Sequence, residues 1–167
     1  MQIRFPLSSL RSAQENELKP GELVFLREPE ASPLAIACAY RPESNRATRF
    51  FLRKEDNAMT VATLKSIRPR YARSSVPSYA LRLGRAVEQP SQKHRDWVNH
   101  VGIDAEGPFV IARTDTLDDV SVIDTTEWRR EGTTERLDYI GALFSDWQLL
   151  SVDGRGNESL IFQMGVW

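Results

Sequence analysis

The stretch Leu34-Ala-Ile-Ala-Cys-Ala-Tyr40 alternates larger side chains with alanine at every second position. A period of two is typical of a β-strand, and apolar side chains on both sides indicate that both faces are covered. Alanine also favours helix, so a short helix is the competing interpretation. Because Pro33 and Pro42 confine the segment to strand length, we predict a buried strand.

The segments around this strand also read as strands and turns. Three further strands are predicted at Glu22–Arg27, Thr48–Arg53 and Thr60–Ile67, separated by the turns Glu28–Pro33, Arg41–Asn45 and Lys54–Asn57. Four short strands with regular turns favour a small antiparallel barrel or sandwich. Their spacing is similar to that of SH3-like or Tudor-like barrels, which is a likeness of fold alone.

The second half of the chain mixes strand and helix signals. Strands are predicted at Tyr79–Leu83, Pro108–Ala112 and Val120–Ile123, and short helices at Ser91–His100 and from Asp124 or Thr125 to Trp128. An amphipathic helix is predicted from the helical spacing of Leu137, Ile140, Leu143 and Phe144. The chain ends in a hairpin, with the turn Asp153–Asn157 between the strands Trp147–Val152 and Ser159–Met164. The expected fold class is α+β and mainly β: a barrel or sandwich lobe, then a β-rich lobe with two or three short helices and a C-terminal hairpin.

The best candidate for a boundary is Gln89-Pro-Ser-Gln-Lys93. It divides a basic β-rich lobe, 1–88, from an acidic α+β lobe, 92–167, although one continuous compact domain is the alternative. Pro33–Ala37 resembles Pro108–Ala112, but five residues are too few to establish a repeat.

Acidic and basic residues are sorted to opposite ends of the chain. Residues 1–100 carry 17 Lys and Arg against 10 Asp and Glu, whereas residues 101–167 carry 5 against 13. The overall net charge of −1 therefore conceals a strongly polar chain. Such asymmetry bears on the partners of a protein rather than on its fold.

The sharpest local signal is a basic tract between Asp56 and Glu88, which contains no acidic residue. Its candidate binding residues are Arg68, Arg70, Tyr71, Arg73, Arg82 and Arg85. We expect a non-catalytic binding or adaptor module whose basic surface contacts an acidic protein partner or a second copy of the chain. The alternative ligand is single-stranded nucleic acid, since arginine binds phosphate and tyrosine stacks on unpaired bases. A pI of 6.2 counts against a duplex-binding protein.

His94 and His100, with nearby carboxylates, give a further alternative: a small hydrolase or nuclease. On a helix, positions six apart do not share a face, and no catalytic, metal-binding or cofactor motif is recognised. The acidic segment Asp115–Asp119 lacks the spacing of an EF-hand and reads as a solvated loop. We therefore predict no catalytic residue, no metal and no cofactor.

Cys38 is the single cysteine of the chain, so no intramolecular disulfide can form. Its apolar surroundings in the sequence predict a buried side chain rather than a reactive thiol. The first residues have no apolar core of the kind found in signal peptides, and no apolar stretch approaches the length of a membrane span. The sequence thus favours a cytoplasmic protein without membrane contact.

Overall fold

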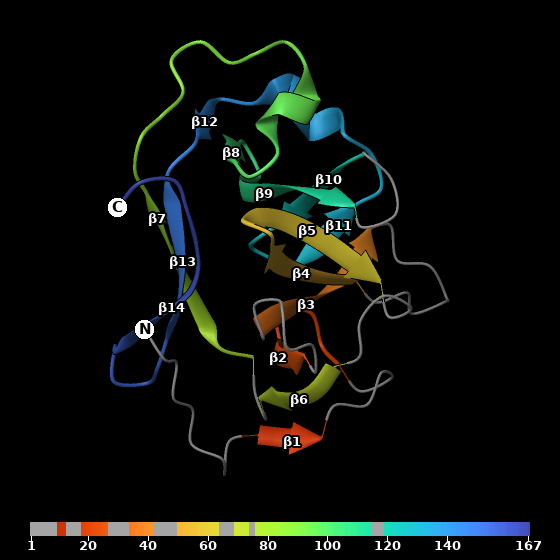
Figure 1. The fold of residues 1–167 in the computed structure, drawn as a ribbon, viewed down its shortest axis with the longest axis vertical. Helices are drawn as coiled ribbons and strands as arrows, with labels where there is room; N and C mark the ends of the chain where they lie inside the picture. Colours follow the sequence, from red (N-terminus) through yellow and green to blue (C-terminus); the bar gives the residue numbers. More distant parts are fainter. Residues whose placement is uncertain are drawn as a thin grey trace.

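The architecture is that of a computed structural model of the chain, drawn as a ribbon in Figure 1. It describes residues 10–12, 18–26, 34–41, 50–63, 69–73, 76–114 and 119–167. The described part is mainly β, as predicted, and its centre is a closed six-stranded β-barrel.

Two antiparallel triplets of strands form the barrel. The first comprises β3 (Leu34–Arg41), β4 (Phe50–Glu55) and β5 (Ala58–Thr63), and the second β9 (Gly107–Thr114), β10 (Val120–Asp124) and β11 (Arg129–Glu131). Two parallel pairings, β5 with β9 and β11 with β3, join the triplets and close the barrel. Since β3–β5 lie before residue 89 and β9–β11 after it, each side of the predicted boundary supplies half of the barrel.

Exchanging the two triplets leaves this pattern of pairings unchanged, so the strands have a pseudo-two-fold arrangement. Strands β3 and β9, which carry the similar stretches noted in the sequence, take equivalent places. The side chains do not correspond, however. Ile36 belongs to the cluster inside the barrel, whereas Ile111 packs in a separate cluster outside it. The short sequence likeness is therefore out of register with the symmetry of the barrel.

The barrel interior is filled by alternate side chains of its strands. They form one buried cluster that includes Ile36, Cys38, Leu52, Val61, Val110, Ala112 and Ile123. The strand predicted around Leu34–Tyr40 is confirmed as β3. Cys38 is completely buried there, and desolvation raises the pKa of its thiol to about 12, in agreement with the predicted inert side chain.

A separate three-stranded sheet stands crosswise at one end of the barrel strands (Figure 1). It contains β7 (Ser78–Leu83), β13 (Trp147–Val152) and β14 (Glu158–Met164), with β13 in the middle. Trp147, Leu149 and Phe162 join the same buried cluster as the barrel interior. The sheet therefore closes this end of the barrel, and the predicted C-terminal hairpin is confirmed as β13–β14.

Five short strands extend the barrel sheet on two sides. On one side β2 (Leu23–Leu26), β6 (Pro69–Arg73) and β1 (Leu10–Ser12) follow β3 in that order. On the other side β8 (Val101–Asp104) pairs with β9, and β12 (Ala142–Phe144) pairs with β8. Figure 1 places β1 and β6 at the opposite end of the molecule from β8 and β12.

The short helices predicted for the second half are wrong. Within the described ranges, helix is limited to two 3-10 segments, η3 (His94–Trp97) and η4 (Glu135–Tyr139), which are too short to span a membrane. Asp124 accepts hydrogen bonds from the backbone N–H groups of Thr126 and Glu127, as a helix cap would, but only a turn follows.

The amphipathic helix predicted near residue 140 is also replaced. Leu137 and Leu143 are buried in one cluster, as their spacing indicates, but they lie on η4 and β12. Between them Gly141 donates its N–H to the carbonyl of Ile103, which begins the pairing with β8. Pairing of β12 with the edge of β8 therefore replaces the helix that the spacing of the apolar residues predicts.

Candidate functional site

The residues of the predicted basic tract lie on two different sheets. Arg68 is outside the described residues. Strand β6 contains Arg70, Tyr71 and Arg73, and only its backbone is described. Arg82 lies on β7, in the three-stranded sheet.

The two arginines of the tract whose side chains are described both have acidic partners from the second half. Arg82 forms an ion pair with Glu158, which crosses the middle strand β13 of the three-stranded sheet. Arg85 Nε lies 3.1 Å from Asp146 Oδ2. Burial tends to raise the pKa of Asp146, but hydrogen bonds from Arg85 and from the backbone N–H of Val166 lower it below its usual value.

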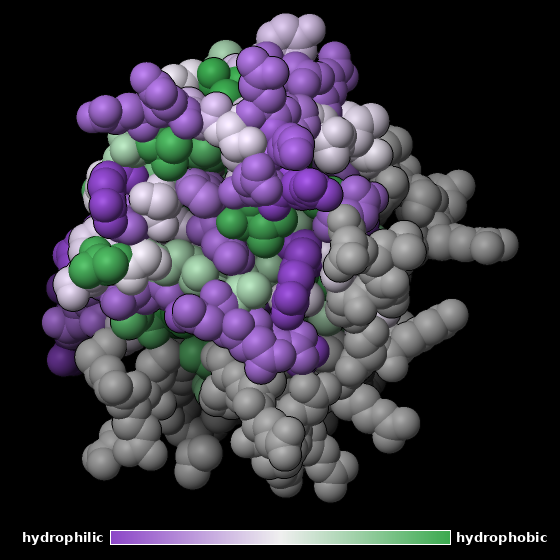
Figure 2. Space-filling view, turned by 45° about the horizontal axis from the view of Figure 1, so that its top comes forward, coloured by the Kyte–Doolittle hydropathy of each residue, from purple (hydrophilic) through white to green (hydrophobic). Residues whose placement is uncertain are grey.

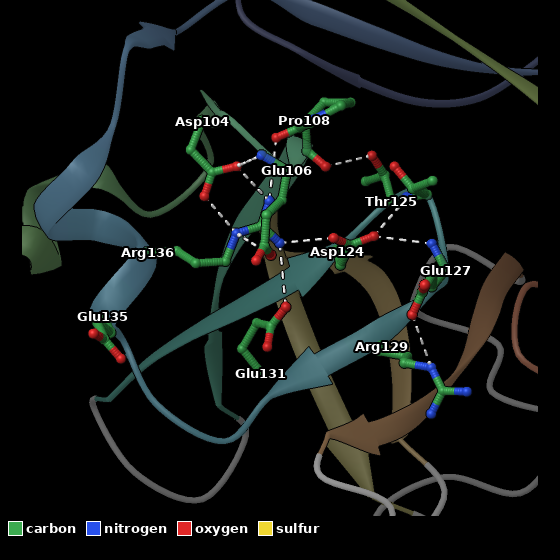
Figure 3. Close-up of polar contacts among 12 residues, drawn as sticks. Asp104, Glu106, Pro108, Asp124, Thr125, Glu127, Arg129, Glu131, Glu135 and Arg136 are labelled. Atoms are coloured by element: carbon green, nitrogen blue, oxygen red, sulfur yellow. Dashed lines mark hydrogen bonds and ion pairs between the residues drawn. The ribbon is translucent and has the colours of Figure 1, made fainter.

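Among the residues that the structure describes, the most concentrated group of charges surrounds Arg136 on η4 (Figure 3). Arg136 Nε and Nη2 donate to the two carboxylate oxygens of Asp104 at 2.6 and 2.8 Å. Arg136 Nη1 donates to Asp124 at 2.7 Å and to Glu131 at 3.2 Å. These carboxylates end β8, β10 and β11, so one guanidinium group joins three strands to η4.

The local backbone explains why these groups meet. The β8–β9 hairpin turns through Gly107 at a φ of 115°, a conformation that favours glycine. The carbonyl of Gly107 also accepts a hydrogen bond from Arg136 Nη2 at 3.2 Å. The guanidinium group stacks on the ring of Phe109, with its carbon 4.6 Å from the ring centroid. Arg136 is thus fixed by polar contacts at its edge and by an aromatic ring at its face.

The electrostatics of the group favour the charged forms. The hydrogen bonds from Arg136 hold the pKa of Asp104 below its ordinary value, against the opposing effect of burial. Burial tends to lower the pKa of Arg136, but its hydrogen bonds to Asp104 and Asp124 outweigh that effect and raise it. Both partners therefore stay ionised, and the arrangement is suited to holding charge rather than to transferring protons.

A pocket of about 400 Å³ opens beside this group. Its lining residues are Asp104, Ala105, Glu106, Glu131, Thr133, Glu135, Arg136 and Tyr139. Four carboxylates against one guanidinium make this acidic pocket negative, and Tyr139 stands at it with 73% of its surface exposed. Figure 2 shows mainly hydrophilic residues on the coloured part of the upper face, with hydrophobic areas small and separate. Polar contacts are therefore the means of recognition that this face offers.

Three carboxylates around Arg136, two of which line the acidic pocket, have the spacing that a cation needs. Oxygen atoms of Glu106, Asp124 and Glu131 lie within 4.8 Å of one another. Asp124 and Glu131 are already hydrogen-bonded to Arg136, whose guanidinium neutralises part of their charge. The cluster is therefore explained by this internal cation, and it supplies no argument for a metal.

The acidic pocket was not predicted from the sequence as a site. Asp104, Glu106 and Asp124 read as loop or capping residues, and of the acidic segment Asp115–Asp119 all but the last residue lies outside the described part. One signal was present, because Arg136 is the only basic residue between Glu131 and Asp153 in a strongly acidic stretch. A lone arginine among carboxylates is a candidate for a buried ion-pair network.

The two histidines are held apart from this group. The His94 ring packs against Trp97 at a tilt of 48°, with ring centroids 4.7 Å apart, and its Nε2 lies 3.7 Å from the Asp138 carboxylate, beyond hydrogen-bond distance. His100 Nδ1 lies 3.1 Å from the backbone carbonyls of Trp97 and Val98. Neither imidazole lines the acidic pocket.

Comparison with known proteins identifies no relative of this chain. No family model, no curated protein and no solved structure matches this chain. Its function has to be inferred from its own charges and contacts.

Proposed function

We propose that the protein is a non-catalytic binding module whose basic end contacts an acidic protein surface, either on a partner or on a second copy of itself. The observation that carries the proposal is spatial. Strand β6, which contains Arg70 and Arg73, lies at the opposite end of the molecule from β8, whose last residue Asp104 lines the acidic pocket (Figure 1). Part of the charge that is separated along the sequence is thus also separated in the fold, whereas Arg82 and Arg85 pair with carboxylates of the second half.

Such an arrangement favours contact between unlike ends. The basic end of one copy and the acidic pocket of another have complementary charge, and head-to-tail contact of this kind is heterologous rather than symmetric. Exposed charges of opposite sign also accelerate the encounter of two molecules. Salt weakens this effect, because charges more than about 10 Å apart are largely screened at moderate ionic strength.

The residues of the basic tract have unequal roles in this proposal. Arg82 and Arg85 have acidic partners within the chain, so they contribute less net charge to a docking surface. Arg70 and Arg73, with Arg68 and Tyr71 beside them in the sequence, are the proposed contact residues. On the acidic side, Glu135 is the exposed lining residue best suited to meet them.

Light scattering over a range of protein and salt concentrations tests self-association, since a complex of unlike ends dissociates as salt rises. Arg73→Glu and Glu135→Lys should each abolish association, and mixing the two variants should restore a complex. Arg155→Glu and Glu88→Lys change exposed charges elsewhere and serve as matched controls.

Partner binding is tested on the same variants with an immobilised acidic polypeptide. Retention that falls with salt and with Arg73→Glu supports the proposal, even for a protein that stays monomeric. A protein that is monomeric throughout and is not retained by the acidic polypeptide contradicts it.

Single-stranded nucleic acid is the alternative ligand of the same strand. Oligonucleotide binding that Arg70→Ala weakens, without retention on acidic polypeptide, would favour this alternative. The contacts of His94 and His100 add no support to a hydrolase or nuclease.

A further inference from the structure

The tip of the β13–β14 hairpin contains an aspartate followed by glycine, Asp153-Gly154. The carboxylate of Asp153 is held by its own turn. Oδ1 accepts hydrogen bonds from the backbone N–H groups of Arg155 and Asn157, both at 2.8 Å, and Oδ2 accepts one from Asn157 Nδ2 at 3.0 Å. The whole turn is exposed, and no atom lies within 4 Å of the position that a side chain of Gly154 would take.

This dipeptide has a spontaneous chemistry of its own. The backbone nitrogen of the glycine attacks the side-chain carboxyl carbon of a protonated aspartic acid, a water molecule leaves, and a five-membered succinimide forms. Water then opens the ring at either carbonyl group, which gives aspartate or isoaspartate. Glycine allows the attack because no side chain shields its nitrogen, but the carboxyl group must be neutral and free to rotate toward that nitrogen.

We propose that Asp153-Gly154 is a latent isomerisation site and that Asn157 keeps it inactive. The side chain of Asn157, together with the backbone N–H groups of Arg155 and Asn157, holds the carboxylate in one orientation, which opposes the rotation that the attack needs. The same hydrogen bond is the largest influence that lowers the pKa of Asp153, so the carboxylate stays ionised and is a poor target for attack.

Isomerisation at this position would affect the barrel. Isoaspartate places an additional carbon atom in the main chain, between groups that now pair closely. Asp153 N–H donates to the carbonyl of Asn157, and the N–H of Gly156 donates to the carbonyl of Asp153, both at 3.0 Å. Since the hairpin presents Trp147 and Leu149 to the barrel interior, a distorted turn loosens the sheet that closes the barrel.

The test follows isotope incorporation in the full-length protein. Each cycle of ring formation and hydrolysis in ¹⁸O-labelled water adds label to Asp153, which peptide mass spectrometry measures together with the isoaspartate content. Asn157→Ala should react about fivefold faster than the native protein, the factor that corresponds to one lost hydrogen bond. Arg155→Lys leaves both the backbone donor and the positive charge beside Asp153 in place and should keep the native rate, which makes it the matched control.

Two further rates and a folding check complete the test. Native protein unfolded in urea gives the unprotected rate, and adding Gly154→Ala to Asn157→Ala should suppress the reaction. Circular dichroism checks that each variant is folded. Equal rates in the native protein and Asn157→Ala would overturn the proposal, as would a native rate equal to the rate in urea.

Discussion

Arg136 and Asp104 form a two-pronged ion pair, with Arg136 Nε and Nη2 at 2.6 and 2.8 Å from the two oxygens of one carboxylate. Both side chains are nearly buried, with 11% and 7% of their surfaces exposed. Asp124 and Glu131 use the remaining donor of the same guanidinium. A single side chain thus ties η4 to the ends of three strands, β8, β10 and β11.

Arg136→Ala should therefore be costly. Removing one member of a buried charge network leaves its partners uncompensated, and we expect the free energy of unfolding to fall by about 3–5 kcal/mol. Urea denaturation monitored by tryptophan fluorescence measures this loss. Arg155→Ala, at an exposed turn, should change stability by less than about 0.5 kcal/mol. A similarly small loss for Arg136→Ala would show that the network adds nothing to the fold.

The Asp104 carboxylate should make stability depend on acid. Its pKa is lowered in the folded protein from the ordinary value of 3.8, so folding is favoured while the carboxylate is ionised in both states. This contribution is present above that ordinary value and is lost as the pH falls through the lower folded pKa. Asp104→Asn, which has no such titration, should show a shallower loss of unfolding free energy below about pH 4. Identical acid dependence in the two proteins would contradict this role.

Gly102 on β8 leaves no room for a side chain. An added Cβ would come within 2.6 Å of two atoms of the Phe109 ring and 2.8 Å from Ile140, where the outer cluster covers the barrel. Gly102→Ala should lower the unfolding free energy by about 1–3 kcal/mol through overpacking. Gly154→Ala is the matched control, because nothing surrounds that position. Thermal denaturation of both variants compares the effects, and an unchanged melting temperature for Gly102→Ala would refute the packing argument.

Local patterns predicted the fold wherever a strand carries its own signal. The alternation in Leu34–Tyr40 indicates β3, and the turn residues Asp153–Asn157 indicate the last hairpin. Short strands such as β6, β8 and β12 have too few residues for a period to show. The barrel closes through parallel pairings between distant segments, and no local pattern contains that information.

The same limit applies to the acidic pocket. The spacing of Leu137 and Leu143 predicts an amphipathic helix, whereas Arg136 lies on the short 3-10 segment η4. The carboxylates around Arg136 end β8, β10 and β11, and the pairing of these strands through β9 brings them together. The proposed basic surface rests on the opposite kind of signal, a contiguous run of charge that the sequence displays directly.

Asn99 joins the barrel to the three-stranded sheet through two hydrogen bonds. Its side-chain Oδ1 accepts the backbone N–H of Met59 at 2.7 Å, and its carbonyl accepts Trp147 Nε1 at 2.8 Å. Its φ of 75° lies in the left-handed region, where asparagine and glycine are tolerated better than other residues. Asn99 therefore combines a backbone conformation with a side-chain acceptor.

Two substitutions at Asn99 separate these roles. Asn99→Gly keeps the conformation but leaves the buried Met59 N–H without its acceptor, which should cost about 1–3 kcal/mol of unfolding free energy. Asn99→Ala loses the same acceptor and also strains the backbone, so it should cost about 1 kcal/mol more than Asn99→Gly. Urea denaturation of both variants measures the difference. If Asn99→Gly is as stable as the native protein, the side-chain hydrogen bond does not help to hold the sheet against the barrel.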